Sequence, residues 1–242
     1  MPNPKFSIIT VTFNAEKTIR RTLKSVASQS YTHIEHIIID GASQDGTLNI
    51  IKEYPSSVSK VISEPDHGIY DAMNKGIREA TGDYLCFLNA GDRLHNAHTL
   101  ESVADGLNER GLPDIIYGDT DIVNDEGIFL YKRRLSPPEQ LNWKSFRNGM
   151  LVCHQSFYIK RTLAEPYDLR YRFSADFDWC IRMMKKAETF YNTHTVLTDY
   201  LNEGLTTQNH KKSLKERFHI MSKYYGLPST IIRHIGFIFR NL

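Results

Sequence analysis

The sequence of 242 residues has only three cysteines, Cys86, Cys153 and Cys180, which lie far apart among apolar residues. Disulfide frameworks and zinc sites need paired or closely spaced cysteines, so we expect buried thiols in a protein of a reducing compartment. Long apolar runs are also lacking, and no stretch reaches the roughly 18 residues of a membrane-spanning helix. The N-terminal stretch MPNPKFSIITVTFN has no basic segment followed by a long apolar one and does not predict a signal peptide.

Neither sign of charge dominates. The 30 Lys and Arg residues nearly balance the 28 Asp and Glu residues, and a formal net charge of +2 gives no indication of a nucleic-acid partner. Two nucleotide-binding fingerprints are absent as well. No G-x-G-x-x-G follows the first predicted strand, and G-x-x-x-x-G-K-[ST] occurs nowhere. These absences argue against an NAD-type oxidoreductase and a P-loop NTPase.

The first half of the sequence alternates between short apolar runs and segments with apolar residues at helical spacing. The apolar runs predict strands over residues 5–13, 34–40, 58–63, 83–89 and 114–119. The spacing predicts helices over residues 15–29, 47–54, 68–80 and 98–110. This alternation predicts an α/β fold with a mainly parallel sheet flanked by helices on both faces.

The second half has a less regular pattern. Strands are predicted over residues 127–134 and 151–161, and a helix over 174–188. From His210 onward the sequence is typical of a basic, helical C-terminal tail. We therefore expect one domain over residues 1–209 and a tail over 210–242.

Polar or Gly-containing clusters follow four of the predicted strands. They begin at Thr12, Asp40, Asn89 and Gly118. In an open parallel sheet ligands bind beyond the carboxyl ends of the strands, so these clusters predict a ligand site at one edge. If the ligand is a nucleotide, the Asp40 carboxylate is suited to accept the imino N–H of uracil or guanine.

Several stretches, in order, resemble family 2 glycosyltransferases with a GT-A fold. They are SIITVTFNAEKTIRRTLKSVASQ, IIIDGASQDGT, EPDHGIYDAMNKGIREATGDYLCFLNAGD, CHQSFYIKR and FSADFDWCIRM. The resemblance covers roughly the first 200 residues and is nearest to bacterial members that build capsule, exopolysaccharide or O-antigen repeat units. It implies an inverting transfer from a nucleotide-sugar, with uracil as the family's usual base and Mg²⁺ or Mn²⁺ as its usual cofactor.

Carried over position by position, the resemblance implies a role for each matching residue. Asp176 is the expected general base, and Asp92 is the expected metal ligand. The residues expected to bind the nucleotide and donor are Thr12, Asn14, Asp40, Ser43, Asp66, Gly68, Asp71, Asn74, Lys75, Asn89, Ala90 and Gly91. His154 and Gln155, on the strand predicted over residues 151–161, and Asp178 are expected to contact the acceptor or donor sugar.

One motif departs from the family's pattern. In Asn89-Ala90-Gly91-Asp92, Asn and Gly replace the first two acidic positions of a D-x-D-D-like metal motif. Mg²⁺ often uses one or two carboxylates together with waters and phosphate oxygens, so a single Asp is sufficient if the nucleotide is a co-ligand. The stretch EGLTTQNH, residues 203–210, is expected to form a lid over the diphosphate through Thr206, Thr207 or His210.

Purely structural explanations remain for several of these residues. Asp45 is well placed to cap the helix that follows it. Asp176 and Asp178 are suited to the first turn of a helix, where the helix dipole favours acidic side chains. His154 beside Cys153 is compatible with a buried core histidine.

The tail is the part of the chain with the strongest charge bias. Its basic residues from Lys211 onward are Lys211, Lys212, Lys215, Arg217, Lys223, Arg233 and Arg240, against one acidic residue, Glu216. A basic segment with an apolar side favours a membrane interface, which would suit a lipid-linked sugar acceptor. Packing on the domain or on a second subunit is the alternative.

The sequence as a whole favours a glycosyltransferase that acts in the cytoplasm near the inner membrane face, with a nucleotide-sugar donor and a glycan or lipid-linked acceptor. A nucleotidyltransferase is disfavoured, because the stretch TFNAEKT after the first strand is not a basic, Gly-rich phosphate loop. A catalytically inactive nucleotide-sugar-binding or scaffold subunit stays open, because the acidic motif is depleted.

Overall fold

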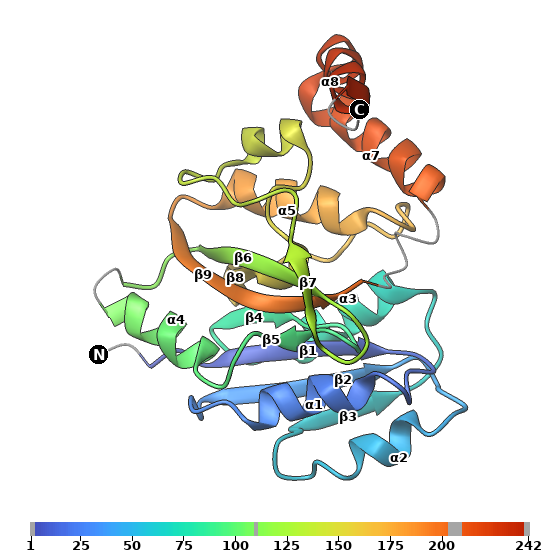
Figure 1. Ribbon diagram of the computed structural model, residues 1–242, viewed down its shortest axis with the longest axis vertical. Helices are drawn as coiled ribbons and strands as arrows, with labels where there is room; N and C mark the ends of the chain where they lie inside the picture. The colour runs from blue at the N-terminus through green and yellow to red at the C-terminus, as the bar shows by residue number, and fades with distance from the viewer. Residues whose placement is uncertain (1–2, 109–110, 203–209, 240–242) are drawn as a thin grey trace.

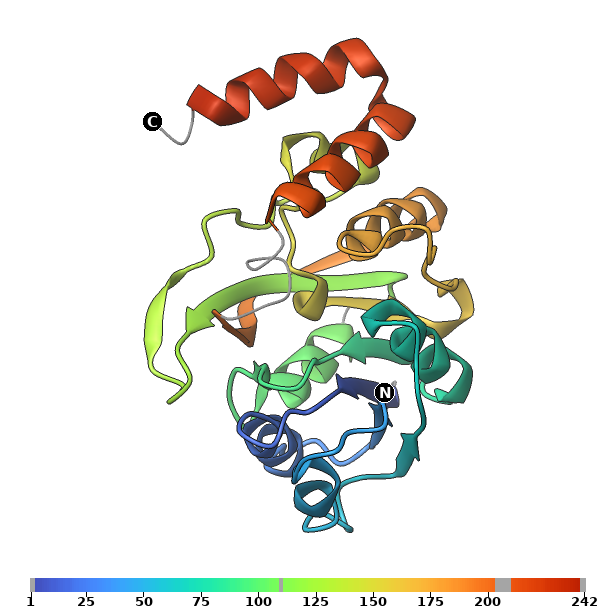
Figure 2. The same cartoon turned by 90° about the vertical axis from the view of Figure 1, so that its right-hand side faces the viewer.

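The computed structural model describes residues 3–108, 111–202 and 210–239. In this part of the chain, nine strands form one mixed sheet in the order β3-β2-β1-β4-β8-β6-β9-β5, with β7 pairing with β6 (Figure 1). Helices cover both faces of the sheet (Figure 2).

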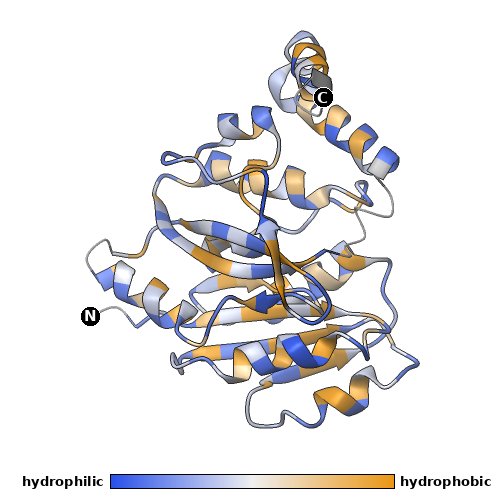
Figure 3. Cartoon of the chain, in the orientation of Figure 1, coloured by the Kyte–Doolittle hydropathy of each residue, from blue (hydrophilic) through white to orange (hydrophobic). Residues whose placement is uncertain are grey.

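The first four strands are parallel and lie close to their predicted positions. They are β1 (Phe6–Thr12), β2 (Ile34–Asp40), β3 (Lys60–Ser63) and β4 (Tyr84–Phe87). Every residue of β1 and β4 is buried, as expected for strands covered by helices on both faces. Apolar residues run along these strands (Figure 3).

The other strands were harder to predict. They are β5 (Arg93–Leu94), β6 (Ile115–Val123), β7 (Phe129–Lys132), β8 (Phe157–Lys160) and β9 (Phe190–Leu201). The sequence did not predict β9, whose polar residues mask its pattern, although it is the longest strand described. Strand β6 runs to Val123, so the Gly118 cluster lies inside it and not beyond its end.

The direction of the central strands decides which ends meet. Strand β8 is antiparallel to both β4 and β6, so β6 points the same way as β4. Strand β9 is parallel to β6. The carboxyl ends of β1, β2, β4, β6 and β9 therefore lie along one edge of the sheet.

Helices divide between the two faces of the sheet (Figures 1 and 2). On one side lie α1 (Ile19–Ala27), α2 (Thr47–Ile51) and α4 (Thr99–Asn108). On the other lie α3 (Ile69–Glu79) and α5 (Ala175–Lys186). The largest buried cluster includes α3 and α5 residues such as Met73 and Trp179.

Three short 3-10 helices occur in the second half: η1 (Trp143–Asn148), η2 (His154–Ser156) and η3 (Arg161–Leu163). The strand predicted over residues 151–161 was wrong in its first half, because His154 and Gln155 lie in η2 and β8 begins only at Phe157. The Ser156 N–H bonds to the Cys153 carbonyl at 3.0 Å, which closes the turn and prevents ladder pairing there.

The tail forms two helices, as predicted: α7 (His210–Tyr225) and α8 (Leu227–Phe239). Helix α7 packs beside α5, and α8 projects away from the sheet (Figure 2). Three residues of α7, Ile220, Met221 and Tyr225, are buried in the main core. The expected lid residues 203–209 lie outside the described residues, and of His210 the structure shows only that it begins α7.

Because α7 contributes to the core and α8 contributes little, two truncations should differ. A chain ending at residue 226 should keep a melting temperature within a few degrees of the full chain. The free energy of unfolding of a chain ending at residue 209 should be lower by several kcal/mol, since each buried apolar side chain contributes about 1.5–3 kcal/mol to it. Thermal unfolding followed by circular dichroism compares the two. Equal melting temperatures would show that residues 210–242 are a separable tail.

Candidate active site

The loops that follow β1 and β2 are joined side by side. The Asn14 N–H bonds to Ser43 Oγ at 2.8 Å, and the Gln44 N–H bonds to Asn14 Oδ1 at 2.9 Å. Asn14 and Ala42 have positive φ angles of 48° and 63°, which aims the two loops toward one another. The predicted residues Thr12, Asn14 and Ser43 are thus brought together at the sheet edge.

Asp40, at the end of β2, holds the joined loops in place from the interior of the protein. It is fully buried, and its carboxylate accepts hydrogen bonds from the Ser43 N–H at 3.0 Å and from the Ser43 and Ser63 hydroxyls at 2.5 and 2.6 Å. In this arrangement both oxygens are already bonded, so Asp40 fixes the position of Ser43.

An exposed aromatic ring borders the same loops. Phe13 is 63% exposed although it directly follows a fully buried strand. A Cβ atom on Gly41 would lie 2.6 Å from Asp66 Oδ2 and 3.3 Å from the Phe13 ring, so any larger residue there would displace these two side chains. Asp66 also accepts the Gly68 N–H at 2.8 Å. Sequence reasoning did not single out Phe13, but an aromatic residue at a ligand-binding edge is a usable signal for a stacking surface.

The turn after β4 is held by α1. The Thr22 hydroxyl donates to the Asp92 carbonyl at 2.7 Å and accepts from the Gly91 N–H at 2.9 Å. The Ala90 N–H bonds to the Val11 carbonyl at 3.2 Å, which places the turn beside the end of β1. Thr22, which the sequence did not indicate, therefore positions the motif Asn89–Asp92.

Asp92 is buried at the centre of this edge, with 4% of its surface exposed. Its oxygens accept from the Leu201 N–H and the Gln155 side-chain amide, both at 2.9 Å. Burial raises the pKa of this carboxyl to about 7, although both hydrogen bonds and the Arg21 charge oppose the rise. A cation bound here would favour the charged carboxylate. Gln155 is thus placed on the metal candidate and not on an open sugar surface.

Two buried oxygens at the same edge have no hydrogen-bond partner among the described residues. They are Thr12 Oγ1, at the end of β1, and Asn89 Oδ1, at the start of the adjacent turn. Leaving a buried polar atom unbonded costs about 1–3 kcal/mol. A polar ligand or a hard cation at this edge would satisfy them.

Asp176 lies in the first turn of α5 and is partly exposed. Its Oδ1 accepts from the Tyr70 hydroxyl at 3.0 Å and from the Phe177 N–H at 2.9 Å. Burial, and then the Asp176 charge, raises the pKa of Tyr70 well above its usual value, so Tyr70 remains a hydrogen-bond donor. Tyr70 thus orients the expected base.

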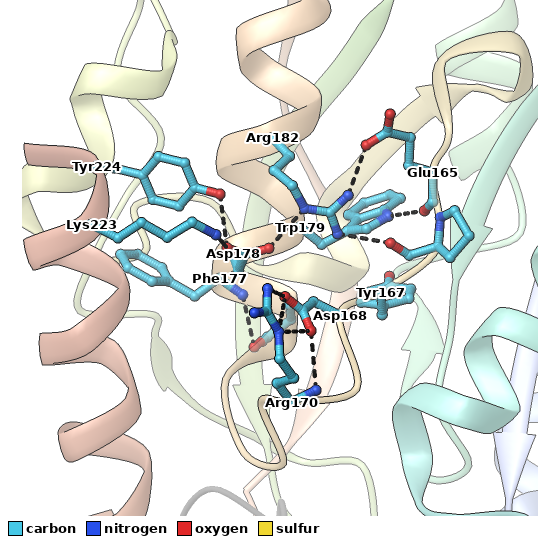
Figure 4. Close-up of polar contacts among 12 residues, drawn as sticks. Glu165, Tyr167, Asp168, Arg170, Phe177, Asp178, Trp179, Arg182, Lys223 and Tyr224 are labelled. Carbon is cyan, nitrogen blue, oxygen red and sulfur yellow. Dashed lines mark hydrogen bonds and ion pairs between the residues drawn. The ribbon is translucent and has the colours of Figure 1, made fainter.

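Asp178 has a different environment from Asp176, and Figure 4 shows the partners of Asp178 on α5 and α7. It is fully buried, and its carboxylate binds Arg182 Nε at 2.7 Å, Lys223 Nζ at 3.1 Å and the Tyr224 hydroxyl at 2.8 Å. These partners fill its oxygens, so the expectation of acceptor contact is not supported. Asp178 instead fixes α7 to α5.

Other predicted donor residues make local structural contacts. The Asn74 side chain bonds twice to the Tyr167 backbone, at 2.6 and 3.1 Å. The Lys75 ammonium bonds to the Pro65 carbonyl at 2.8 Å, and Asp71 accepts the His67 N–H at 3.0 Å. These three residues therefore hold the loop before α3 and its neighbours in place.

His154 is a core residue in this structure. It is 3% exposed, stacks on Phe87 with ring centroids 4.9 Å apart, and bonds through Nε2 to the Tyr167 hydroxyl. Burial lowers the pKa of His154 to about 4, so it is neutral at pH 7. The structural alternative for His154 is the one that its surroundings favour.

A second group of metal-compatible side chains lies on the face covered by α1. Ligand atoms of His95, Asp121 and Asp199 lie within 4.8 Å of one another. Asp199 already binds Arg93 at 2.6 Å and His95 Nδ1 at 2.7 Å. A cavity of about 320 Å³ lies close by, between α1, β5 and the turn before β7, and shares Arg93 and His95 with this group. It is separate from the strand-end loops that carry the predicted donor residues.

Comparison with known proteins gives a consistent result. Residues 7–165 match the model of "Glycosyl transferase family 2". A PGL/p-HBAD biosynthesis glycosyltransferase of Mycobacterium bovis is 34% identical over 96% of this chain and 90% of its own length. The putative teichuronic acid biosynthesis glycosyltransferase TuaG of Bacillus subtilis is 28% identical over 90% of this chain and 91% of its own.

The fold is also that of a known structure. The crystal structure of S. aureus TarS 1-349 in complex with UDP-GlcNAc superposes with a TM-score of 0.73, over 96% of this chain and 73% of that one, at 18% identity. This likeness confirms the predicted GT-A architecture. Because the family model spans more than half of the sequence and the mycobacterial relative spans nearly all of it, the chain belongs to glycosyl transferase family 2 and is a glycosyltransferase.

Proposed function

We propose that the protein is an inverting glycosyltransferase of the cytoplasm, which transfers a sugar from a UDP-linked donor to a hydroxyl of a glycan or lipid-linked acceptor in bacterial surface polysaccharide synthesis. One observation carries this proposal. Asp176 Oδ1 is held by Tyr70, while Asp176 Oδ2 accepts no hydrogen bond from the described residues. Asp176 thus has a free oxygen for a substrate proton.

The nucleotide is assigned to the loops after β1 and β2. Phe13 offers an exposed ring for the base, and Thr12 Oγ1 offers a buried atom that has no partner among the described residues. Asn14 and Ser43 complete the wall through their mutual hydrogen bond. Aromatic stacking and a few fixed polar groups are the usual means of binding a nucleoside.

The Asn89–Asp92 turn is assigned to the diphosphate and a divalent metal, Mg²⁺ or Mn²⁺. The donor set fits a hard cation, since the buried Asp92 carboxylate has no directly bonded cation among the described residues and Asn89 Oδ1 is unbonded. When bound, such a metal stabilises negative charge on a leaving diphosphate. Gln155 orients the Asp92 carboxylate, since its side-chain amide bonds to Asp92 Oδ2.

Asp176 is assigned as the general base. The acceptor oxygen forms its bond to the anomeric carbon as the bond to the diphosphate breaks, and its proton passes to the Asp176 carboxylate. Holding the two substrates in line supplies much of the remaining rate enhancement. The relatives' printed names, which include teichuronic acid biosynthesis, support a glycan or glycolipid acceptor.

Asp176→Asn should remove turnover and keep nucleotide binding. We expect the rate of UDP release from a cognate UDP-sugar to fall by about 10²–10⁴-fold, because the base is lost. The dissociation constant for UDP, measured by calorimetry, should stay within about twofold of the wild type. Asp178→Asn is the matched control, and it should lower the melting temperature because it disturbs a buried ion pair. Wild-type turnover in Asp176→Asn would exclude Asp176 as the base.

Removing Asp92 should remove the response to metal. We expect Mn²⁺ or Mg²⁺ to stimulate UDP release by the wild type. Asp92→Asn should need more than about tenfold more metal, if it responds at all. Asp121→Asn is the control for the second group of metal-compatible residues and should respond as the wild type does. Loss of the metal response in Asp121→Asn alone would move the site to His95, Asp121 and Asp199.

A membrane contact is proposed for α8. Leu227, Ile231 and Ile235 are spaced four residues apart and are 52%, 43% and 51% exposed, and Ile232 beside them is 69% exposed. Exposed lysines of α7, such as Lys212 and Lys215, add positive charge that suits anionic lipids. Among the described residues no helix is long and apolar enough to cross a membrane.

Ile231→Asp combined with Ile235→Asp should weaken binding to vesicles of phosphatidylethanolamine and phosphatidylglycerol. Each apolar side chain buried in lipid contributes about 1.5–3 kcal/mol, so co-sedimentation should fall at least about tenfold. Leu169→Asp, at a similarly exposed loop position, should leave co-sedimentation unchanged. A wild-type dimer in light scattering that the double variant abolishes, with no vesicle binding, would assign the α8 face to a second subunit.

A further inference from the structure

The beginning of α5 is held by a carboxylate from α7. Glu216 accepts hydrogen bonds from three successive backbone N–H groups, those of Arg172 at 2.9 Å, Phe173 at 2.8 Å and Ser174 at 2.9 Å. It is the single acidic residue of α7 and is partly buried. Three backbone donors on one carboxylate form a strong, charge-assisted arrangement.

Glu216 holds the segment directly before α5, a helix whose own N-cap makes no side-chain capping bond. Its N-cap residue is Ser174, whose side chain makes no capping hydrogen bond. The Ser174 hydroxyl lies instead 2.9 Å from the hydroxyl of Ser213, which is also on α7. A serine cap normally satisfies one of the free N–H groups of the first turn and contributes about 1 kcal/mol. At α5, Glu216 binds the Ser174 N–H and the two before it, and its negative charge is favourable beside the helix N-terminus.

The last of these contacts, at the Ser174 N–H, lies two residues before the assigned base. Asp176 is fixed on one side by the Tyr70 hydroxyl from α3. Its backbone position depends on where the first turn of α5 begins, and Glu216 holds the residues directly before that turn. A catalytic group that is displaced by about 1 Å can lose 10²-fold in rate. The position of Asp176 is therefore set by α3 and α7 together.

A second attachment keeps α7 in place independently of Glu216. Lys223 and Tyr224 bind the buried Asp178 carboxylate, two turns further along α7 (Figure 4). Ile220 and Met221, between the two attachments, are buried in the main core. Loss of the Glu216 carboxylate should therefore release the residues before α5 while α7 remains docked.

We propose that Glu216 is a positioning residue for Asp176, through which the C-terminal helix α7 takes part in catalysis. The proposal rests on the assignment of Asp176 as the general base. It gives residues beyond the matched family region, 7–165, a defined part in the reaction.

The test compares Glu216→Ala and Glu216→Gln with the wild type in steady-state UDP release. We expect Glu216→Ala to lower kcat by about 10–100-fold and to leave KM for the donor within about twofold. Glu216→Gln should recover part of the loss, since its amide oxygen still accepts hydrogen bonds without the charge. His219→Ala, at an exposed position of α7 three residues further on, is the control and should keep the wild-type kcat. Unchanged UDP binding and a melting temperature close to that of the wild type show that each variant is folded.

A double-mutant cycle separates positioning from general loosening of the fold. In an Asp176→Asn background, Glu216→Ala should change the residual rate by less than about twofold, because Glu216 acts only through Asp176. An equal fractional loss in both backgrounds would overturn the proposal, and so would a wild-type kcat in Glu216→Ala while Asp176→Asn is inactive. Full activity of Asp176→Asn would instead refute the base assignment, and the role of Glu216 with it.

Discussion

The buried carboxylate of Asp92 is the contact on which the site depends. It joins the turn after β4 to the end of β9, through the Leu201 N–H, and to the 3-10 helix η2, through Gln155. These segments come from three separate parts of the sequence, and one side chain holds them in register. Burying this carboxylate disfavours its charged form, and the pKa of Asp92 is raised to about 7. The same desolvation makes the position favourable for a cation, because a positive charge there would compensate the carboxylate.

This arrangement explains how a depleted acidic motif is compatible with glycosyl transfer. The family pattern supplies several carboxylates after the fourth predicted strand, whereas this chain has Asn89, Gly91 and Asp92 there. Asn89 keeps an uncharged oxygen that has no partner among the described residues. Gly91, with a φ of 103°, allows the turn to lie against Leu201, where a Cβ would approach within 2.8 Å of the leucine side chain. The turn therefore carries less negative charge than the family pattern, and its glycine packs closely against Leu201.

The opposite wall of the site is built by helices and not by strands. Asp176 and Asp178 are separated by one residue, yet the first remains partly open beside Tyr70 and the second is closed among Arg182, Lys223 and Tyr224. Helical geometry turns residues two apart by about 200°, so Asp176 faces Tyr70 on α3 while Asp178 faces α7. Helix α7 is consequently part of the packed domain beside α5, and α8 extends beyond it.

The sequence by itself determined the alternation of strands and helices, the edge at which polar loops gather and the family, because these follow from local periodicity and short motifs. It also indicated Asp92 and Asp176, which occupy motif positions. Only the tertiary structure showed that four other expected site residues make structural contacts instead. They are Asn74, Lys75, His154 and Asp178. The tertiary structure was also needed to show that β9 pairs with β6, that Phe13 is exposed and that Glu216 binds the residues before α5. The physical reason is distance along the chain: Asp92 and Leu201 are 109 residues apart and Glu216 and Ser174 are 42 apart, and no local pattern encodes such partners.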